Sequence, residues 1–148
     1  MNSSVTTQVF EKPPADFHPR VEIAACYLEV DHHLLLLQRM REKSEPGLWG
    51  VPAGKIEPGE TPLHGGLREL FEETGIAAPD LTDLGKLYMR KPGLDYVYHC
   101  FKMYLDHRPE VHLSLEHLEY RWVTLQEIKK LPLMTGALEA LKYYGWNV

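Results

Sequence analysis

The stretch "GKIEPGETPLHGGLRELFEETGI", residues 54–76, decides the fold and raises the question of function. Thr61 can cap a helix, Pro62 suits the first helical position, and Gly75 fits the left-handed residue that ends many helices. The pattern therefore predicts a helix that starts just after Thr61, stops just before Gly75 and is entered from a glycine-containing loop.

One side of this helix is apolar. Leu63, Leu67, Leu70 and Phe71 follow the spacing i, i+4, i+7 and i+8, which brings them together in a single stripe along a helix. We expect this stripe to pack against the core and the opposite side of the helix to face solvent or a cleft.

Three glutamates lie on that opposite side. Glu69, Glu72 and Glu73 fall within an arc of about 100°. A solvated helix face is the ordinary reason for such a cluster. Here, however, Glu69 and Glu73 form a like-charged i, i+4 pair that costs about 0.2–0.5 kcal/mol, and the helix dipole disfavours anions in the last turn. Arg68 offsets only part of this repulsion, by pairing with Glu72 four residues later.

A divalent cation would remove the repulsion. Carboxylate oxygens are the ligands that Mg²⁺ and Mn²⁺ prefer. Gly54 and Gly59 let the preceding loop turn sharply, so that a backbone carbonyl oxygen can approach the same ion. The segment thus favours a metal site over a purely solvated surface.

Composition limits the alternatives. The chain has 148 residues, of which 44% are hydrophobic and 25% are charged, as in one globular domain. Its net charge of −5 argues against a nucleic-acid partner.

The N-terminus has no apolar segment typical of a signal peptide, and no apolar run is long enough for a membrane span, which predicts a cytoplasmic protein. Cys26 and Cys100 are predicted to be buried free thiols.

The rest of the chain alternates strand and helix patterns. Residues 1–20 are expected to form a loosely ordered lead-in, and residues 21–148 a single α/β or α+β domain. A hairpin is expected around "DHH". Short helices are predicted at 124–131, with Thr124 as N-cap, and at 135–144. Strands are predicted at 21–30, 34–40, 84–90, 95–105, 111–115 and 119–123.

Residues 54–76 match the pattern GX5EX7REUXEEXGU, where U is aliphatic. This pattern is the Nudix box, and the chain therefore resembles the Nudix (MutT-like) hydrolase superfamily. We call Glu69, Glu72 and Glu73 the box glutamates. The flanking "LWGVPAG" and "EHLEYRWVTLQEI" are similar to the family as well. The resemblance implies an α/β/α sandwich around a mixed sheet, with residues 54–76 as a loop-helix-loop. It also implies hydrolysis of the diphosphate linkage of a small nucleotide with Mg²⁺ or Mn²⁺.

The resemblance implies roles for the acidic residues of this segment. Glu72 and Glu73 would be metal ligands, and Glu69 would be a further ligand or would organise the water bound to the metal. The carbonyl of Ala53 or Gly54 would supply another oxygen.

Other residues would support these ligands or move a proton. Arg68 would hold the glutamates in orientation, Glu60 would brace the loop, and Gly75 would end the helix. The proton acceptor would be a carboxylate of the box helix, such as Glu69, or one in a later loop, for which Glu116 is the candidate and Glu119 the alternative.

The substrate-binding residues are less defined. Arg39, Arg41 and Arg90 are candidates for contacts with phosphate, and Tyr96 for stacking on a base, although surface arginines often serve solubility and strand aromatics are often core. Pro92 lies near a marker proline of ADP-ribose hydrolases, but a turn between two strands accounts for it better.

The sequence leaves several functions open. The substrate is expected among nucleoside triphosphates, ADP-ribose or sugar nucleotides, and dinucleoside polyphosphates. The alternatives are a non-catalytic domain that senses a nucleotide and, less favoured, an RNA 5′-end decapping enzyme. A monomer and a homodimer are both compatible with the sequence.

Overall fold

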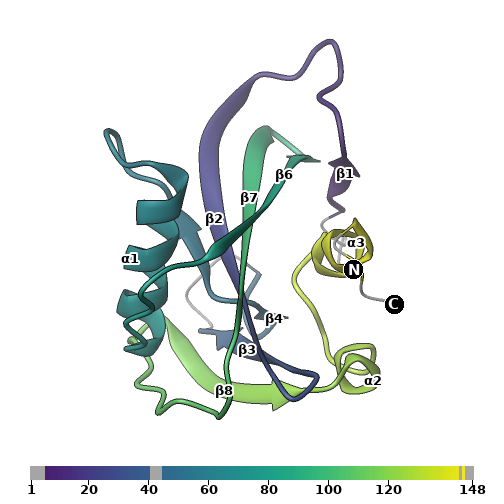
Figure 1. The fold of residues 1–148 in the computed structure, drawn as a ribbon. Helices are drawn as coiled ribbons and strands as arrows, with labels where there is room; N and C mark the ends of the chain where they lie inside the picture. Colours follow the sequence, from purple (N-terminus) through teal and green to yellow (C-terminus); the bar gives the residue numbers. More distant parts are fainter. Residues whose placement is uncertain (1–5, 41–44, 144, 146–148) are drawn as a thin grey trace.

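A mixed β-sheet runs through the middle of the molecule in the computed structural model, which describes residues 6–40, 45–143 and 145 (Figure 1). The strand order is β1-β6-β7-β2-β3-β4, with β5 on β2 and β8 on β3. β2 and β7 pair in parallel, and the other pairs are antiparallel. The strands are β1 (Gln8–Phe10), β2 (Pro19–Val30), β3 (His33–Arg39), β4 (Trp49–Gly50), β5 (Ala53–Lys55), β6 (Thr82–Lys91), β7 (Leu94–Tyr104) and β8 (His117–Val123).

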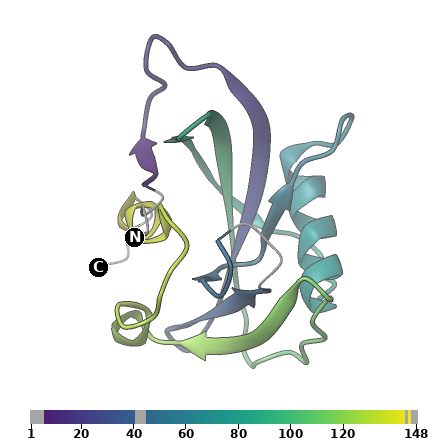
Figure 2. The same ribbon diagram turned by 180° about the vertical axis from the view of Figure 1, so that it is seen from behind.

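Helices cover both faces of the sheet. α1 (Pro62–Thr74) lies on one side, and α3 (Ala137–Tyr143) lies on the other, after the single-turn α2 (Leu125–Ile128) (Figures 1 and 2). Leu70 of α1 packs in one apolar cluster, while Ile128 and Leu141 pack in a second. This arrangement confirms the α/β/α sandwich that the sequence predicted.

The centre of the sheet is β2, whose residues 24–30 are all buried. At its end the chain turns through Asp31 and His32, both with positive φ, into β3. Two left-handed residues are what a two-residue type I′ turn requires, and this turn matches the twist of the paired strands. The hairpin expected around "DHH" is therefore confirmed.

The ends of α1 follow the prediction. The Thr61 side chain accepts a hydrogen bond from the backbone N–H of His64 at 3.1 Å. At the other end Gly75 has φ +75°, and its N–H donates to the Phe71 carbonyl at 2.8 Å. Both caps satisfy backbone groups that a helix end leaves without partners.

The buried side of α1 differs from the prediction. Phe71, expected in the core, is 56% exposed, whereas Glu73, expected on the outer side, is only 5% exposed. Gly66 lies on the same side of the helix as Glu73 and faces the sheet, where a Cβ would be in ordinary contact with Phe101 and Ala24. The helix thus approaches the sheet along its glycine-containing side, which turns Glu73 inward and Phe71 outward.

The predicted strand at 111–115 is also wrong. This part of the chain forms no strand and instead crosses the C-terminal end of α1. The backbone N–H of His112 donates to the Thr74 carbonyl at 2.7 Å, and that of Ser114 donates to the Glu73 carbonyl at 3.2 Å. These bonds satisfy the last carbonyls of the helix. They also satisfy the N–H groups of His112 and Ser114, which therefore need no partner in a neighbouring strand.

Several smaller features complete the comparison. The expected lead-in contains β1, which pairs with β6, and its last residues already belong to β2. Cys26 and Cys100 are free and buried, as predicted. Thr124 caps α2, although this helix is shorter than expected. None of the helices in the described part of the chain combines the length and apolarity needed to cross a bilayer.

Candidate active site

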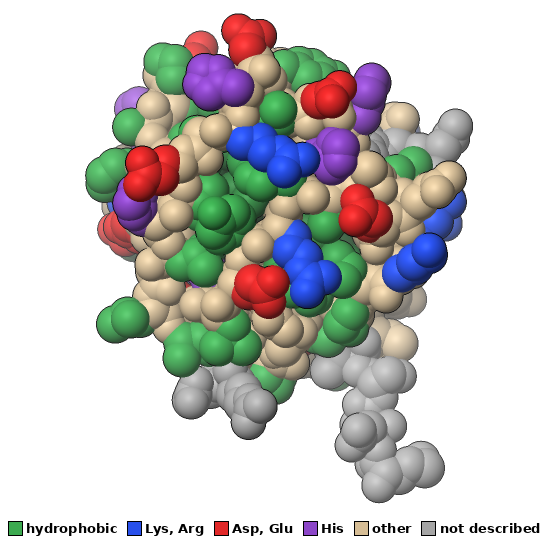
Figure 3. Space-filling model, turned by 90° about the horizontal axis from the view of Figure 1, so that it is seen from below, with side chains coloured by type: hydrophobic (Ala, Val, Ile, Leu, Met, Phe, Trp, Pro, Cys, Tyr) green, Lys and Arg blue, Asp and Glu red, His purple; other side chains and the backbone are tan. Residues whose placement is uncertain are grey.

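The second half of α1 lies in the lower part of the molecule in Figure 1, and strand β5 and the segment 111–116 both contact it. The backbone N–H of Ala53 donates to Glu73 Oε1 at 3.2 Å, which joins β5 to the helix. Figure 3 views this end directly and shows acidic and basic side chains interspersed around apolar surface. The candidate site is thus built from two neighbouring elements, β5 and α1, and from the segment 111–116, which lies far from them in the sequence.

Arg68 donates hydrogen bonds to three glutamates around it. Its guanidinium donates two hydrogen bonds to Glu60, at 2.6 and 2.9 Å, and one each to Glu69 at 2.9 Å and Glu72 at 3.1 Å. A further bond runs to the Lys55 carbonyl at 3.0 Å. The planar fork of arginine suits such multiple contacts. Arg68 is therefore placed to orient two of the three box glutamates and to tie α1 to the preceding loop.

Glu60 links that loop to the helix. Besides its bonds from Arg68, it accepts a hydrogen bond from the Glu57 backbone N–H at 2.8 Å. The Arg68 hydrogen bond, followed by the one from Glu57, lowers the pKa of Glu60 from 4.5 to about 2. This carboxylate is held ionised in the loop that leads into α1.

The lowered pKa of Glu60 gives a testable pH dependence. Because its pKa is lower in the folded state, Glu60 stabilises the protein at pH values above its ordinary pKa of 4.5. It loses this contribution as the pH falls toward about 2. We expect Glu60→Gln to lower Tm near neutral pH and the difference from the wild type to shrink under acidic conditions. Thermal unfolding across that pH range measures it, and a difference that does not change with pH would contradict the assignment.

Glu73 lies in an unusual electrostatic environment for a carboxylate. Burial raises its pKa to about 9, and the hydrogen bond and charge of Glu69 add to this effect. The Ala53 N–H opposes the shift, and the charge of Glu116 raises the pKa further. The fold has therefore brought Glu69, Glu73 and Glu116 near one another, although Glu116 is far from the other two in sequence.

Gly54 leaves no room for a side chain, because the Glu69 carboxylate occupies the place where its Cβ would lie. A Cβ at this position would lie 2.1 Å from Cδ of Glu69, well inside van der Waals contact. The backbone of β5 and the Glu69 carboxylate thus share one small volume. This close approach places Gly54 beside the carboxylates.

The donor atoms here suit a hard divalent cation. Among the residues that the structure describes, no three His, Cys, Asp or Glu side chains are arranged as a metal-binding group. Glu69 and Glu72 are turned toward Arg68, and Glu73 toward the Ala53 N–H. The set nevertheless offers only oxygen ligands, and a cation would stabilise the ionised form of buried Glu73, which burial and Glu69 disfavour. The chemistry of these donor atoms therefore fits a hard divalent cation.

The two later glutamates differ in their surroundings. Glu116 is exposed, and its backbone carbonyl accepts a hydrogen bond from the Met40 N–H at 3.1 Å, while its charge acts on Glu73. Glu119 instead accepts a hydrogen bond from Arg121 at 3.2 Å within β8. Of the two, Glu116 is the one that the structure places beside the box.

The predicted substrate-binding residues are spread over the fold. Arg39 ends β3 opposite His117, next to Glu116 in the chain. Arg41 lies outside the described residues. Tyr96 packs with Ala140 of α3 on the other face of the sheet, and burial raises its pKa to about 12. Of these residues, only Arg39 is close in register to the segment that carries Glu116.

Arg90 lies at the far end of the sheet. It pairs with Asp95 at 2.7 Å and with Asp16 at 3.2 Å, in the β6–β7 hairpin at the upper end of Figure 1. Pro92 and Gly93 form the two-residue turn of this hairpin, with Gly93 at φ +78°. The structure therefore confirms that Pro92 belongs to a turn between two strands.

Sequence reasoning missed three backbone contributions to the site. The Lys55 carbonyl holds Arg68, and the N–H groups of His112 and Ser114 bind the end of α1. Main-chain groups leave no mark in residue identity, so the sequence carries no signal for them.

Residues 18–144 match the NUDIX domain family, and the chain belongs to that family. It is 29% identical over 127 residues to the CTP pyrophosphohydrolase of Escherichia coli (strain K12), a match that covers 84% of this chain and 90% of the relative. It is 38% identical over 90 residues to the asymmetrical bis(5′-nucleosyl)-tetraphosphatase of Mus musculus. That match covers 56% of this chain and 60% of the mouse enzyme.

A solved structure shows the same architecture. The MutT protein from Methanosarcina mazei Go1 superimposes with a TM-score of 0.72 and 26% sequence identity. The match covers 85% of this chain and 91% of that protein. The similarity therefore extends over most of both chains.

Proposed function

We propose that this chain is a divalent-metal-dependent hydrolase that cleaves the diphosphate linkage of a small nucleotide. The observation that carries the proposal is the convergence of Glu69, Glu73 and Glu116 beside Gly54, with Arg68 holding the helix glutamates. Carboxylates gathered in this way cost free energy unless a cation neutralises them. The arrangement therefore favours a role in metal-assisted chemistry over a role in stability.

The box residues would hold the ion. Glu72 and Glu73, with Glu69 and a carbonyl of Ala53 or Gly54, would bind Mg²⁺ or Mn²⁺. Such an ion supplies positive charge that stabilises the developing charge on the diphosphate, and it acidifies the attacking water.

Other residues of the chain would position these ligands and accept the proton. Arg68 keeps Glu69 and Glu72 in place through its fork of hydrogen bonds. Glu116 would take the proton from the attacking water, because it is exposed to solvent and lies close enough to Glu73 to act on its charge. Arg39 would contact a substrate phosphate from the end of β3.

Nucleoside triphosphates are the substrate class that we propose to test first. The similarity to the E. coli CTP pyrophosphohydrolase extends over nearly the full length of both chains, whereas the match to the tetraphosphatase spans about three fifths of that enzyme. Dinucleoside polyphosphates come second. ADP-ribose follows, because the hairpin turn already accounts for Pro92.

A substrate panel tests the proposal. Canonical and oxidised nucleoside triphosphates, ADP-ribose, sugar nucleotides and dinucleoside polyphosphates are incubated with Mg²⁺ or Mn²⁺, and kcat/KM and products are compared. We expect turnover of at least one class, with a nucleoside monophosphate among the products and complete inhibition by EDTA. If every compound stays intact with both metals, the enzymatic proposal is wrong and a nucleotide-sensing domain replaces it.

A further inference from the structure

A cavity lies at the opposite end of the sheet from the box glutamates. It has a volume of about 480 Å³ and is bounded by the β6–β7 hairpin, the segment that enters β1 and the start of β2. This volume is within the range of about 300–1,000 Å³ that is common for small-molecule sites. None of the box glutamates lines it.

The strand register separates this cavity from the candidate active site. Ala53 of β5 pairs with Ala25 of β2, which in turn pairs with Cys100 of β7. Asp95, which lines the cavity, lies five residues before Cys100 on the same strand. At about 3.3 Å per residue the two places are roughly 17 Å apart along the strand.

The cavity wall is rich in basic residues, although the chain as a whole has a net charge of −5. Arg20, Arg90, Lys91 and His18 line it, against the single acidic residue Asp95. Arg90 is neutralised by Asp95 and Asp16 and so serves to shape the wall.

Two of these basic residues are held less tightly than Arg90. Lys91 forms a longer ion pair with Glu45, at 3.8 Å, and lies 5.8 Å from the centroid of the Tyr96 ring. Arg20 is exposed and pairs with no carboxylate among residues 6–40, 45–143 and 145. Polar groups of Thr6 and Gln8 and the apolar surface of Pro92 and Leu94 complete the lining.

We propose that this cavity is a second, non-catalytic site for a phosphorylated small molecule of about the size of a mononucleotide. Arg20 and Lys91 would bind the phosphate through charge-assisted hydrogen bonds, since both are cationic donors at the cavity wall. Thr6 and Gln8 would donate to or accept from the rest of the ligand, and Leu94 would contact its apolar body. The proposal is independent of the proposed hydrolysis, because it uses none of the residues to which that reaction is assigned.

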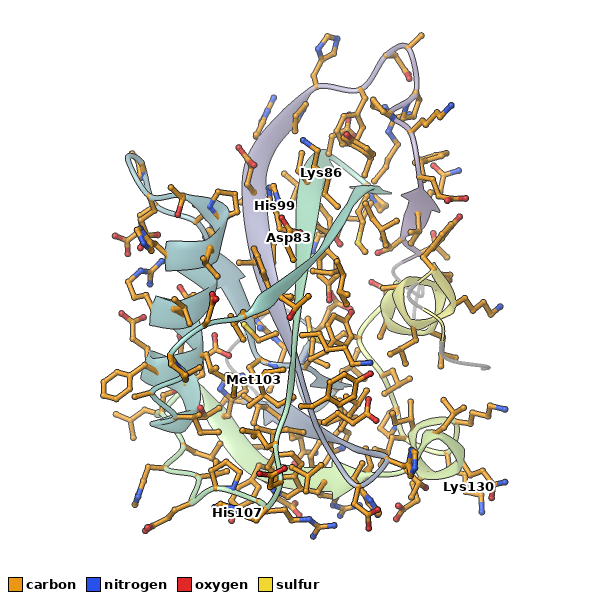
Figure 4. The ribbon with its side chains drawn as sticks, viewed as in Figure 1. Asp83, Lys86, His99, Met103, His107 and Lys130 are labelled. Atoms are coloured by element: carbon orange, nitrogen blue, oxygen red, sulfur yellow. The ribbon has the colours of Figure 1, made fainter. Side chains whose placement is uncertain are left out.

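Calorimetric titration of the full chain with AMP in EDTA tests this site. AMP has no phosphoanhydride bond and EDTA removes divalent ions, so turnover cannot interfere. We expect saturable binding, and Arg20→Ala should weaken it by about tenfold or more, because a hydrogen bond to a charged group is lost. Arg20→Lys should retain most of the affinity. Lys130→Ala is the matched control, since Lys130 is exposed near α2, far from the hairpin (Figure 4).

Three further titrations distinguish phosphate binding in this cavity from binding through the base alone and from binding at the box glutamates. Adenosine, which lacks the phosphate, should bind at least tenfold more weakly than AMP, and inorganic phosphate should compete with AMP. Glu73→Gln should bind AMP like the wild type. The proposal is overturned if AMP does not bind, if Arg20→Ala binds as tightly as Lys130→Ala, if adenosine binds as well as AMP, or if Glu73→Gln abolishes binding.

Discussion

Replacing Glu73 with glutamine is expected to remove nearly all turnover while leaving the fold intact. Substitutions in the surroundings of a metal site already cost about 10- to 100-fold, so the loss of a ligand should lower kcat/KM by more than about 100-fold. Glutamine has the shape of glutamate, and it can still accept the hydrogen bond that the Ala53 N–H donates to Glu73. Steady-state kinetics on the best substrate of the panel measure the effect.

The fold and the metal are checked separately for this variant. Because Glu73 is 5% exposed and burial and Glu69 disfavour its ionised form, a glutamine that is always neutral should not lower Tm without metal. Calorimetric titration with Mn²⁺ should show weaker binding. Glu139→Gln, on the exposed side of α3, is the control and should retain full activity. Full activity of the Glu73 variant would rule out its assigned role as a ligand.

Gly54→Ala is expected to lower kcat/KM by about tenfold or more with little loss of stability. The new Cβ would overlap Cδ and Oε2 of Glu69, at 2.1 and 2.2 Å, so the carboxylate must move. A flexible side chain moves at small cost in folding energy. The same movement takes Glu69 away from Arg68, which holds it at 2.9 Å, and a small misplacement is costly in catalysis.

Gly66→Ala provides the matched control. A Cβ there would lie 3.4 Å from Phe101 and 3.5 Å from Ala24, both ordinary contacts. Alanine inside a helix is favoured over glycine by about 0.5–1 kcal/mol, so this variant should be active and at least as stable as the wild type. Equal losses of activity in both variants would show that the overlap with Glu69 has no special effect.

Neighbouring residues in the sequence correctly predicted where α1 begins and ends, but not which side of the helix faces the core. Thr61 and Gly75 act within one helical turn, so their effect can be read from neighbouring residues alone. The inward turn of Glu73 depends instead on which side of the helix packs against β2 and β7, and Gly66 lies on that side. This orientation is set by the sheet, and no pattern within the helix reveals it.

The candidate site was predictable to a similar extent. The box glutamates and Arg68 are neighbours along one helix, and their spacing brings them together. The approach of Glu116 depends on the chain crossing the end of α1, where the sequence instead suggested a strand at 111–115. Arg90 and Tyr96 were named by residue type, and the strand register places them away from the glutamates.

The crossing of α1 by the segment 111–116 has a consequence for how the protein can diverge. Ser114 binds the carbonyl of Glu73 through its backbone N–H, so the residue that offers a carboxylate also anchors the chain that carries Glu116. A main-chain bond of this kind survives most changes of side chain. Side chains at neighbouring loop positions can therefore change without removing the bond that holds the two carboxylates at a fixed spacing.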